Sequence, residues 1–166
     1  MGYETLKSFL ADWKHESEST EKVLAALTDA SLAQKVGPDD RTLGRIAWHV
    51  AATIPEMMSL TGLPLEHLPE KPPAKAAEIL AAYRSASASF VDAVSAKWKD
   101  ADLAVLDEMY GEKWPRGMTL AGLVHHQVHH RGQMTVLMRQ AGLRVPGIYG
   151  PAREDWPSMG MAAPEV

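Results

Sequence analysis

The segment TLAGLVHHQVHHRGQMTVLMRQAG (residues 119–142) decides the fold, because its apolar residues repeat with the period of an amphipathic helix. We expect Thr119 to cap the start of this helix, and Gly142 with the following Pro146 to end it. One arc of the helix carries seven apolar residues: Leu120, Leu123, Val124, Met134, Leu137, Met138 and Ala141. The segment therefore predicts a helix that packs one face against a core.

Three further segments have the same helical period, at roughly residues 3–27, 42–61 and 74–98. Thr42, or Asp40 before it, can cap the second helix, and Pro55 should kink it. Residues 62–73 hold four prolines and a glycine, which indicates a linker rather than an element. The residues between the third and fourth helices predict a loop with at most a short helical turn.

Four helices with almost no strand pattern predict an all-α four-helix bundle. The long linker can cross the bundle, so the second and third helices need not be antiparallel neighbours. The length of 166 residues suits a single domain, 1–166, with a loop-rich C-terminal tail from about residue 143.

Composition excludes several classes of function. The net charge of -4, with acidic and basic residues interleaved, argues against a nucleic-acid-binding protein. The chain has no cysteine, so disulfides, zinc knuckles and a protein thiol nucleophile are excluded, and any metal must be held by His, Asp or Glu. No signal peptide or membrane span is evident, so we expect a cytoplasmic protein without a membrane partner.

Four histidines lie within residues 125–130, and a helical projection divides them into two pairs. His126 and His130 lie roughly 100° and 60° from the centre of the apolar arc, at the edge of the core, whereas the other pair, His125 and His129, lies roughly 160° away. Because residues i and i+4 share a face, the rings of the first pair can converge on one ion.

A third metal ligand must come from another helix, and His49 projects to the edge of the core of the second helix. The sequence therefore predicts a metal site formed by His49, His126 and His130. Half-buried hydrogen-bonding histidines are the alternative. The run HQVHH (residues 126–130) has the spacing of a zinc protease motif, but Gln127 replaces the glutamate that acts as the base, so the protease interpretation fails.

Four other residues are candidates for the second shell or the pocket. Arg131 and Gln127 project into the apolar arc of the fourth helix, and a buried guanidinium needs a partner, which Glu16 can supply. The alternative to a role in the site is an ion pair that joins the first and fourth helices. Trp48 projects off the core arc, where it can line a cleft or a dimer surface. Trp114 and Tyr149 are loop aromatics that can wall a pocket or anchor the tail.

Three stretches resemble the DinB-like (DinB/YfiT) family of metal-binding four-helix proteins: RTLGRIAWHVA (41–51), HHQVHHRGQMTVLMRQAG (125–142) and VPGIYGPAREDW (145–156). The resemblance covers most of the chain. It implies an up-down-down-up order of helices, frequent homodimers, and a divalent metal ion (zinc, nickel or iron) held by the residues matching His49, His126 and His130.

The better understood members of this family are S-transferases that use a low-molecular-weight thiol as cosubstrate. The resemblance thus implies a metal-dependent enzyme that transfers such a thiol to a small electrophilic substrate in detoxification or the stress response. Three imidazoles leave coordination positions open, as in catalytic sites. A metal-dependent hydrolase and a non-catalytic metal- or ligand-binding stress protein remain alternatives.

Overall fold

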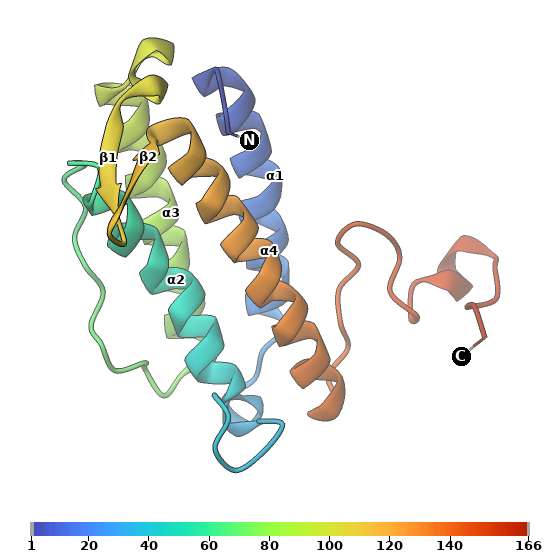
Figure 1. Cartoon of the computed structure of the whole chain (residues 1–166). Helices are drawn as coiled ribbons and strands as arrows, with labels where there is room; N and C mark the ends of the chain where they lie inside the picture. Colours follow the sequence, from blue (N-terminus) through green and yellow to red (C-terminus); the bar gives the residue numbers. More distant parts are fainter. Residues whose placement is uncertain (1, 166) are drawn as a thin grey trace.

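The computed structural model describes residues 2–165 and contains four long helices, α1 (Leu6–Ala25), α2 (Leu43–Ser59), α3 (Ala76–Lys97) and α4 (Arg116–Gln140) (Figure 1). Short 3-10 helices follow α1 (Asp29–Ala33) and α3 (Asp100–Ala104), and another lies near the C-terminus (Trp156–Met159). No helix within residues 2–165 combines the length and apolar character needed to cross a membrane. The predicted all-α bundle is confirmed, with a small hairpin added.

The order of the helices in space follows from the long connection between α2 and α3. Figure 1 shows α1 and α4 running in one direction and α2 and α3 in the other, which is the up-down-down-up order. Residues 60–75 run back along the bundle, so α3 begins at the same end as α2. Each helix packs mainly against two others: α1 contacts α3 and α4, and α2 contacts α3 and α4. As a result α2 and α4 are antiparallel neighbours that share a seam.

Local capping explains where α1 and α2 begin. The side chains of Thr5 and Thr42 accept hydrogen bonds from the backbone N–H groups of Ser8 and Arg45, three residues later. At the C-terminal end of α4, Gly142 takes a φ of 72°, and the N–H of Leu143 donates to the carbonyl of Met138. The predicted caps at Thr42 and Gly142 are therefore confirmed.

The prediction of a loop before α4 is wrong in part, because residues 106–115 form a hairpin. Strand β1 (Leu106–Met109) pairs antiparallel with β2 (Glu112–Pro115). The two turn residues have positive φ, 53° at Tyr110 and 86° at Gly111, as a tight hairpin turn requires. The hairpin continues directly into α4, which begins at Arg116, so the expected cap at Thr119 is also wrong: Thr119 is buried within the helix.

The first turn of α4 touches the N-terminal segment closely. The N–H of Tyr3 donates to the carbonyl of Gly117 at 3.0 Å, and a Cβ at residue 117 would lie 2.2 Å from the carbonyl oxygen of Tyr3. Only glycine allows this approach. The contact fixes the end of α4 that follows the hairpin.

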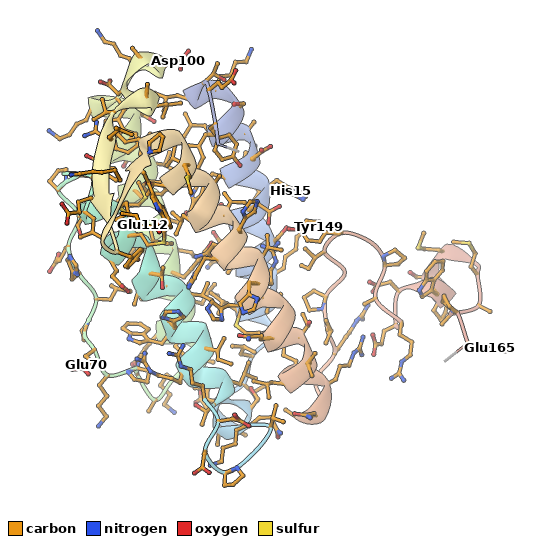
Figure 2. All side chains as sticks on the ribbon, in the orientation of Figure 1. His15, Glu70, Asp100, Glu112, Tyr149 and Glu165 are labelled. Atoms are coloured by element: carbon orange, nitrogen blue, oxygen red, sulfur yellow. The ribbon has the colours of Figure 1, made fainter. Side chains whose placement is uncertain are left out.

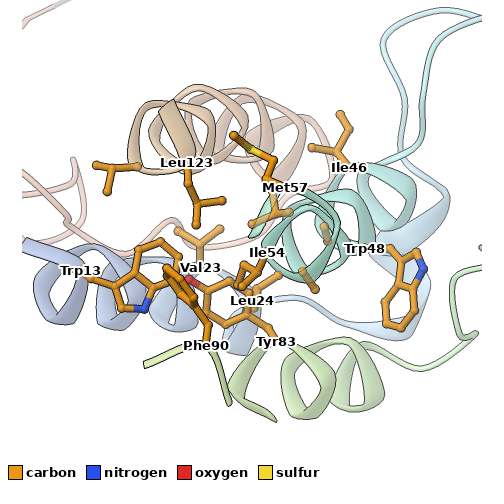
Figure 3. Packing of buried hydrophobic residues seen from close by; sticks show 14 of the residues in the cluster. Trp13, Val23, Leu24, Ile46, Trp48, Ile54, Met57, Tyr83, Phe90 and Leu123 are labelled. Atoms are coloured by element: carbon orange, nitrogen blue, oxygen red, sulfur yellow. The ribbon is translucent and has the colours of Figure 1, made fainter. Parts of the chain in front are cut away.

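The core lies between the four helices and is filled by large side chains from each of them (Figure 3). Trp13 and Phe90 meet edge to face, with ring centroids 5.2 Å apart, and Ile54 and Leu123 are fully buried. Trp48 stands apart from these residues in Figure 3, although it is also buried. Its indole N–H donates to the carbonyl of Pro69 at 2.8 Å, so it holds the linker against α2.

Candidate metal centre

Three imidazoles meet at the seam between α2 and α4. His49 lies in the middle of α2, and His126 and His130 lie one turn apart on α4. The Nε2 atoms of His49 and His126 are 3.0 Å apart, and one ring nitrogen from each of the three residues lies within 4.8 Å of the other two. Within residues 2–165 no other group of three such side chains is as close.

A hydrogen bond between the two helices sets their separation at this level. The side chain of Gln127 is fully buried, and its Nε2 donates to the carbonyl of Val50 at 2.9 Å. These residues directly follow His126 and His49 in the sequence. The bond therefore fixes the two backbones next to the imidazoles that they carry.

Neighbouring side chains hold two of the rings through Nδ1. The Nδ1 of His130 lies 2.7 Å from the amide oxygen of Gln133, which can only accept, so this nitrogen carries the proton. The Nδ1 of His49 lies 3.4 Å from Oγ1 of Thr53, whose hydroxyl donates to the carbonyl of His49 and leaves its oxygen free to accept. In both rings Nε2 is thereby left with its lone pair, as a metal ligand requires.

The three imidazoles are neutral near pH 7. Burial, and to a smaller extent nearby positive charges, lower the pKa of His49 and of His126 to about 4. Burial also lowers the pKa of His130, against a smaller opposing effect of the hydrogen bond to Gln133. The charge of Arg41 contributes to the lowered pKa of all three rings.

This geometry fits a metal ion. Two nitrogens that bind one ion at about 2.0–2.1 Å stand about 2.9–3.4 Å apart, and His49 and His126 meet that condition at 3.0 Å. The Nδ1 of His126 is buried, and within residues 2–165 it has no hydrogen-bond partner, so the contact that this ring makes is the one between its Nε2 and that of His49. Three imidazole nitrogens without a carboxylate suit zinc, nickel or iron rather than magnesium or calcium.

Two larger hollows and a smaller one border the imidazoles; the smaller, of about 180 Å³, is lined in part by Arg45, Trp48 and His49. The first, the arginine hollow, has a volume of about 590 Å³ and is lined by Val36, Asp40, Arg41, Ile46, His130, Gln133, Val136 and Leu137. The second, the tryptophan hollow, has a volume of about 340 Å³ and is lined by His49, Thr53, Glu56, Met57, Tyr110, Trp114, Gly122 and His126. The hairpin, which the sequence did not predict, supplies the two large aromatics of the second hollow.

The ion pair predicted between Arg131 and Glu16 is present and almost completely buried. The guanidinium lies 2.5 Å from the carboxylate of Glu16 and also donates to the hydroxyls of Thr20 and Tyr149. Tyr149 in turn donates to the carboxylate of Glu16 at 2.7 Å. Figure 2 shows Tyr149 where the C-terminal tail meets the bundle. The cluster joins α1, α4 and the tail.

Of the four secondary candidates, Trp48 lines a hollow beside His49, whereas Glu16, Gln127 and Arg131 line none of the three hollows at the imidazoles. Among the described residues, Glu16, Trp48, Gln127 and Arg131 make no hydrogen bond to any of the three rings. The outward-facing pair, His125 and His129, is exposed.

Sequence reasoning missed the residues that contact the rings or face them. Gln133 and Thr53 lie three and four residues after the histidines that they hold, so helical spacing could have identified both. Arg41 lies in the loop just before the cap of α2, and helical periodicity cannot predict where a side chain in a loop points.

Comparisons with known proteins agree with this description. The model of the DinB family matches residues 1–164. The uncharacterized protein YrdA of Bacillus subtilis (strain 168) is 46% identical over 168 residues, covering 99% of each chain. A crystal structure of a DinB-like protein from Bacillus cereus ATCC 10987 is 46% identical, with a TM-score of 0.86 over 89% of this chain and 99% of that chain. The DinB-like protein YjoA of B. subtilis, 10% identical, shares the fold with a TM-score of 0.69 over 87% of this chain and 99% of that chain.

Proposed function

This chain belongs to the DinB family, and from that premise we propose that His49, His126 and His130 bind one divalent metal ion in an enzyme that transfers a low-molecular-weight thiol to an electrophile. The thiol sulfur would form a bond to an electrophilic carbon, whose leaving group departs with the bonding pair. The thiol proton would pass to solvent. The reaction class is one of detoxification and the stress response.

The two larger hollows that border the imidazoles are the observation that supports a transfer reaction. A transferase must hold two organic molecules against one reacting centre, whereas a hydrolase needs a hollow for only one of them. His130 lines one hollow, and His49 and His126 line the other. When bound, the ion would supply Lewis acidity, which makes a thiol a stronger nucleophile near neutral pH.

The residues around the imidazoles hold the rings in place and leave the set of metal ligands incomplete. Gln133 and Thr53 orient the rings of His130 and His49, and the bond from Gln127 to Val50 fixes the distance between the helices. Within residues 2–165 no carboxylate completes a fourth ligand position. The carboxylate of Glu112 in β2 accepts a hydrogen bond from the indole of Trp114 at 2.8 Å.

A metal-dependent hydrolase and a non-catalytic metal-binding stress protein are the competing proposals. The open ligand set disfavours a purely structural metal site.

We also propose that this single-domain protein forms a homodimer. Its C-terminal tail would take part in the interface, because Tyr149, Met159 and Met161 of this tail are exposed. The elution volume in size-exclusion chromatography with light scattering distinguishes a dimer from a monomer.

Metal binding is tested first, by elemental analysis of the protein after loading with zinc, nickel or iron and removal of free metal. The His126→Ala and His130→Ala variants should bind no stoichiometric metal. His129→Ala is the matched control on the same helix and should bind one ion per chain. Equal loss in all variants would refute the proposed ligand set.

Transfer is tested with the metal-loaded protein, several low-molecular-weight thiols and 1-chloro-2,4-dinitrobenzene, whose thioether product absorbs light. The proposal expects acceleration by at least one thiol, and loss of that acceleration in His126→Ala. Ester hydrolysis without any thiol-dependent reaction would support the hydrolase instead. A metal-loaded protein inactive in both assays would favour the non-catalytic role.

A further inference from the structure

The arginine hollow has walls that are mostly apolar and one cationic side chain that lacks an ionic partner. Ile46 and Leu137 form its buried wall, and Val36 and Val136 remain 69% and 56% exposed at its sides. Apolar side chains left this accessible around a hollow can contact the apolar body of a ligand.

Arg41 differs from most arginines of this chain. Six of the eight arginines lie within 4.0 Å of a carboxylate; within residues 2–165 Arg41 and Arg45 do not. Asp40 also lines the hollow, yet it forms no ion pair with its neighbour. The guanidinium of Arg41 is thus available to an exogenous anion, which it can bind through two parallel hydrogen bonds.

The charges around the imidazoles also favour an anionic ligand. The ligand set contains three neutral nitrogens and no carboxylate, so the protein does not compensate the charge of a divalent ion. The positive charge of Arg41 reaches all three rings. The guanidinium of Arg41 therefore favours an anion at this end of the seam, where Asp40 is the one acidic residue among those that line the hollow.

We propose that the arginine hollow binds an organic anion, with its apolar body against Ile46, Val136 and Leu137 and its carboxylate on the guanidinium of Arg41. This inference rests on the proposed function, in which the anion is one of the two substrates of the transfer. Gln133 lines the same hollow and holds His130, so the bound molecule lies next to the imidazoles.

The probe is 4-phenylbutyrate, compared with the uncharged 4-phenyl-1-butanol in isothermal titration calorimetry, with and without a bound metal ion. The carboxylate should bind more tightly than the alcohol. Arg41→Gln should weaken its binding roughly 10- to 100-fold, the effect of losing a charged hydrogen bond, and leave the alcohol unchanged. Arg45→Gln, the other unpaired arginine, should stay within about twofold of the wild type, since it does not line this hollow.

A second variant tests the apolar wall without disturbing the core. Val136→Trp replaces an exposed side chain and should fill the hollow, so that both probes lose affinity while the midpoint of urea unfolding stays unchanged. Equal affinity for acid and alcohol, or an unchanged affinity in Arg41→Gln, would overturn the inference. Arg41-dependent binding in a protein that takes up no metal would support the anion site and refute the metal proposal.

Discussion

At the scale of single residues, the candidate centre depends on which ring nitrogen of each histidine carries the proton. Gln133 determines this for His130, because an amide oxygen 2.7 Å from Nδ1 can bond only to a protonated nitrogen. The same contact orients the ring toward His49 and His126. A side chain that touches no metal can thereby control metal affinity.

We predict that Gln133→Leu weakens metal affinity about 10- to 100-fold, because the ring of His130 loses the acceptor that fixes its orientation. Gln133 is exposed, so the free energy of unfolding of the metal-free protein should change by less than about 0.5 kcal/mol. Affinity is measured by competition with a chromophoric chelator. Gln140→Leu, a substitution of the exposed glutamine at the end of the same helix, is the control and should keep the affinity of the wild type.

At the scale of helices, α1 and α4 are joined by a charged contact inside the core. Arg131 and Glu16 have side chains that are only 3% and 11% exposed, and Arg131 also donates to the carbonyl of Glu16 and the hydroxyl of Thr20. Removing one partner of such a pair leaves the other charge buried without compensation. Removing one partner of an exposed ion pair costs much less free energy of unfolding, because water solvates the remaining charge.

We therefore predict that Glu16→Ala lowers the free energy of unfolding by about 3–5 kcal/mol, measured by urea denaturation. Glu21→Ala is the matched control on the same helix: it removes a more exposed pair with Arg84 and should cost less than about 1 kcal/mol. Glu16→Gln, which keeps the size of the side chain, should fall near the larger loss. Similar losses for positions 16 and 21 would contradict the role of burial.

The elements show what the sequence could and could not predict. The period of α4 placed Arg131 and Gln127 inside and His125 and His129 outside, because a long helix repeats its pattern over many turns. The hairpin was missed, since each strand has four residues and its turn is Tyr110-Gly111 rather than the usual Asn-Gly. With the hairpin the start of α4 was also missed. The N–H of Arg116 donates to the carbonyl of Val105, which extends the hairpin to the first residue of α4, three residues before Thr119.

The candidate site was predictable to the same extent as the helices that carry it. The three histidines project to core edges on two long helices, and a packed seam brings such edges together. Arg41 and the aromatics Tyr110 and Trp114 come from the loop and the hairpin, whose course depends on local turns and tertiary contacts. The period of the helices could therefore predict the three histidines, but it could not predict the two larger hollows beside them.

At the scale of the whole molecule, the metal site exists only in the folded chain. The linker of residues 60–75 returns along the bundle and lets α2 and α4 become neighbours, although His49 and His126 are 77 residues apart in the sequence. In an unfolded chain the pair on α4 loses its third partner and its helical spacing. An ion that binds all three imidazoles must therefore stabilise the folded state.

We predict that zinc or nickel raises the midpoint of thermal unfolding and that a chelator reverses the rise. At a free metal concentration of 100 times Kd the gain is about 2.7 kcal/mol, or roughly 5–10 °C for a protein of this size. Differential scanning calorimetry measures the shift. His129→Ala should keep it and His126→Ala should lose it, whereas magnesium, which prefers oxygen ligands, should have no effect on the wild type. A shift that persists in His126→Ala would mean that the ion binds elsewhere, because an α4 with His130 alone cannot form the three-nitrogen site with His49.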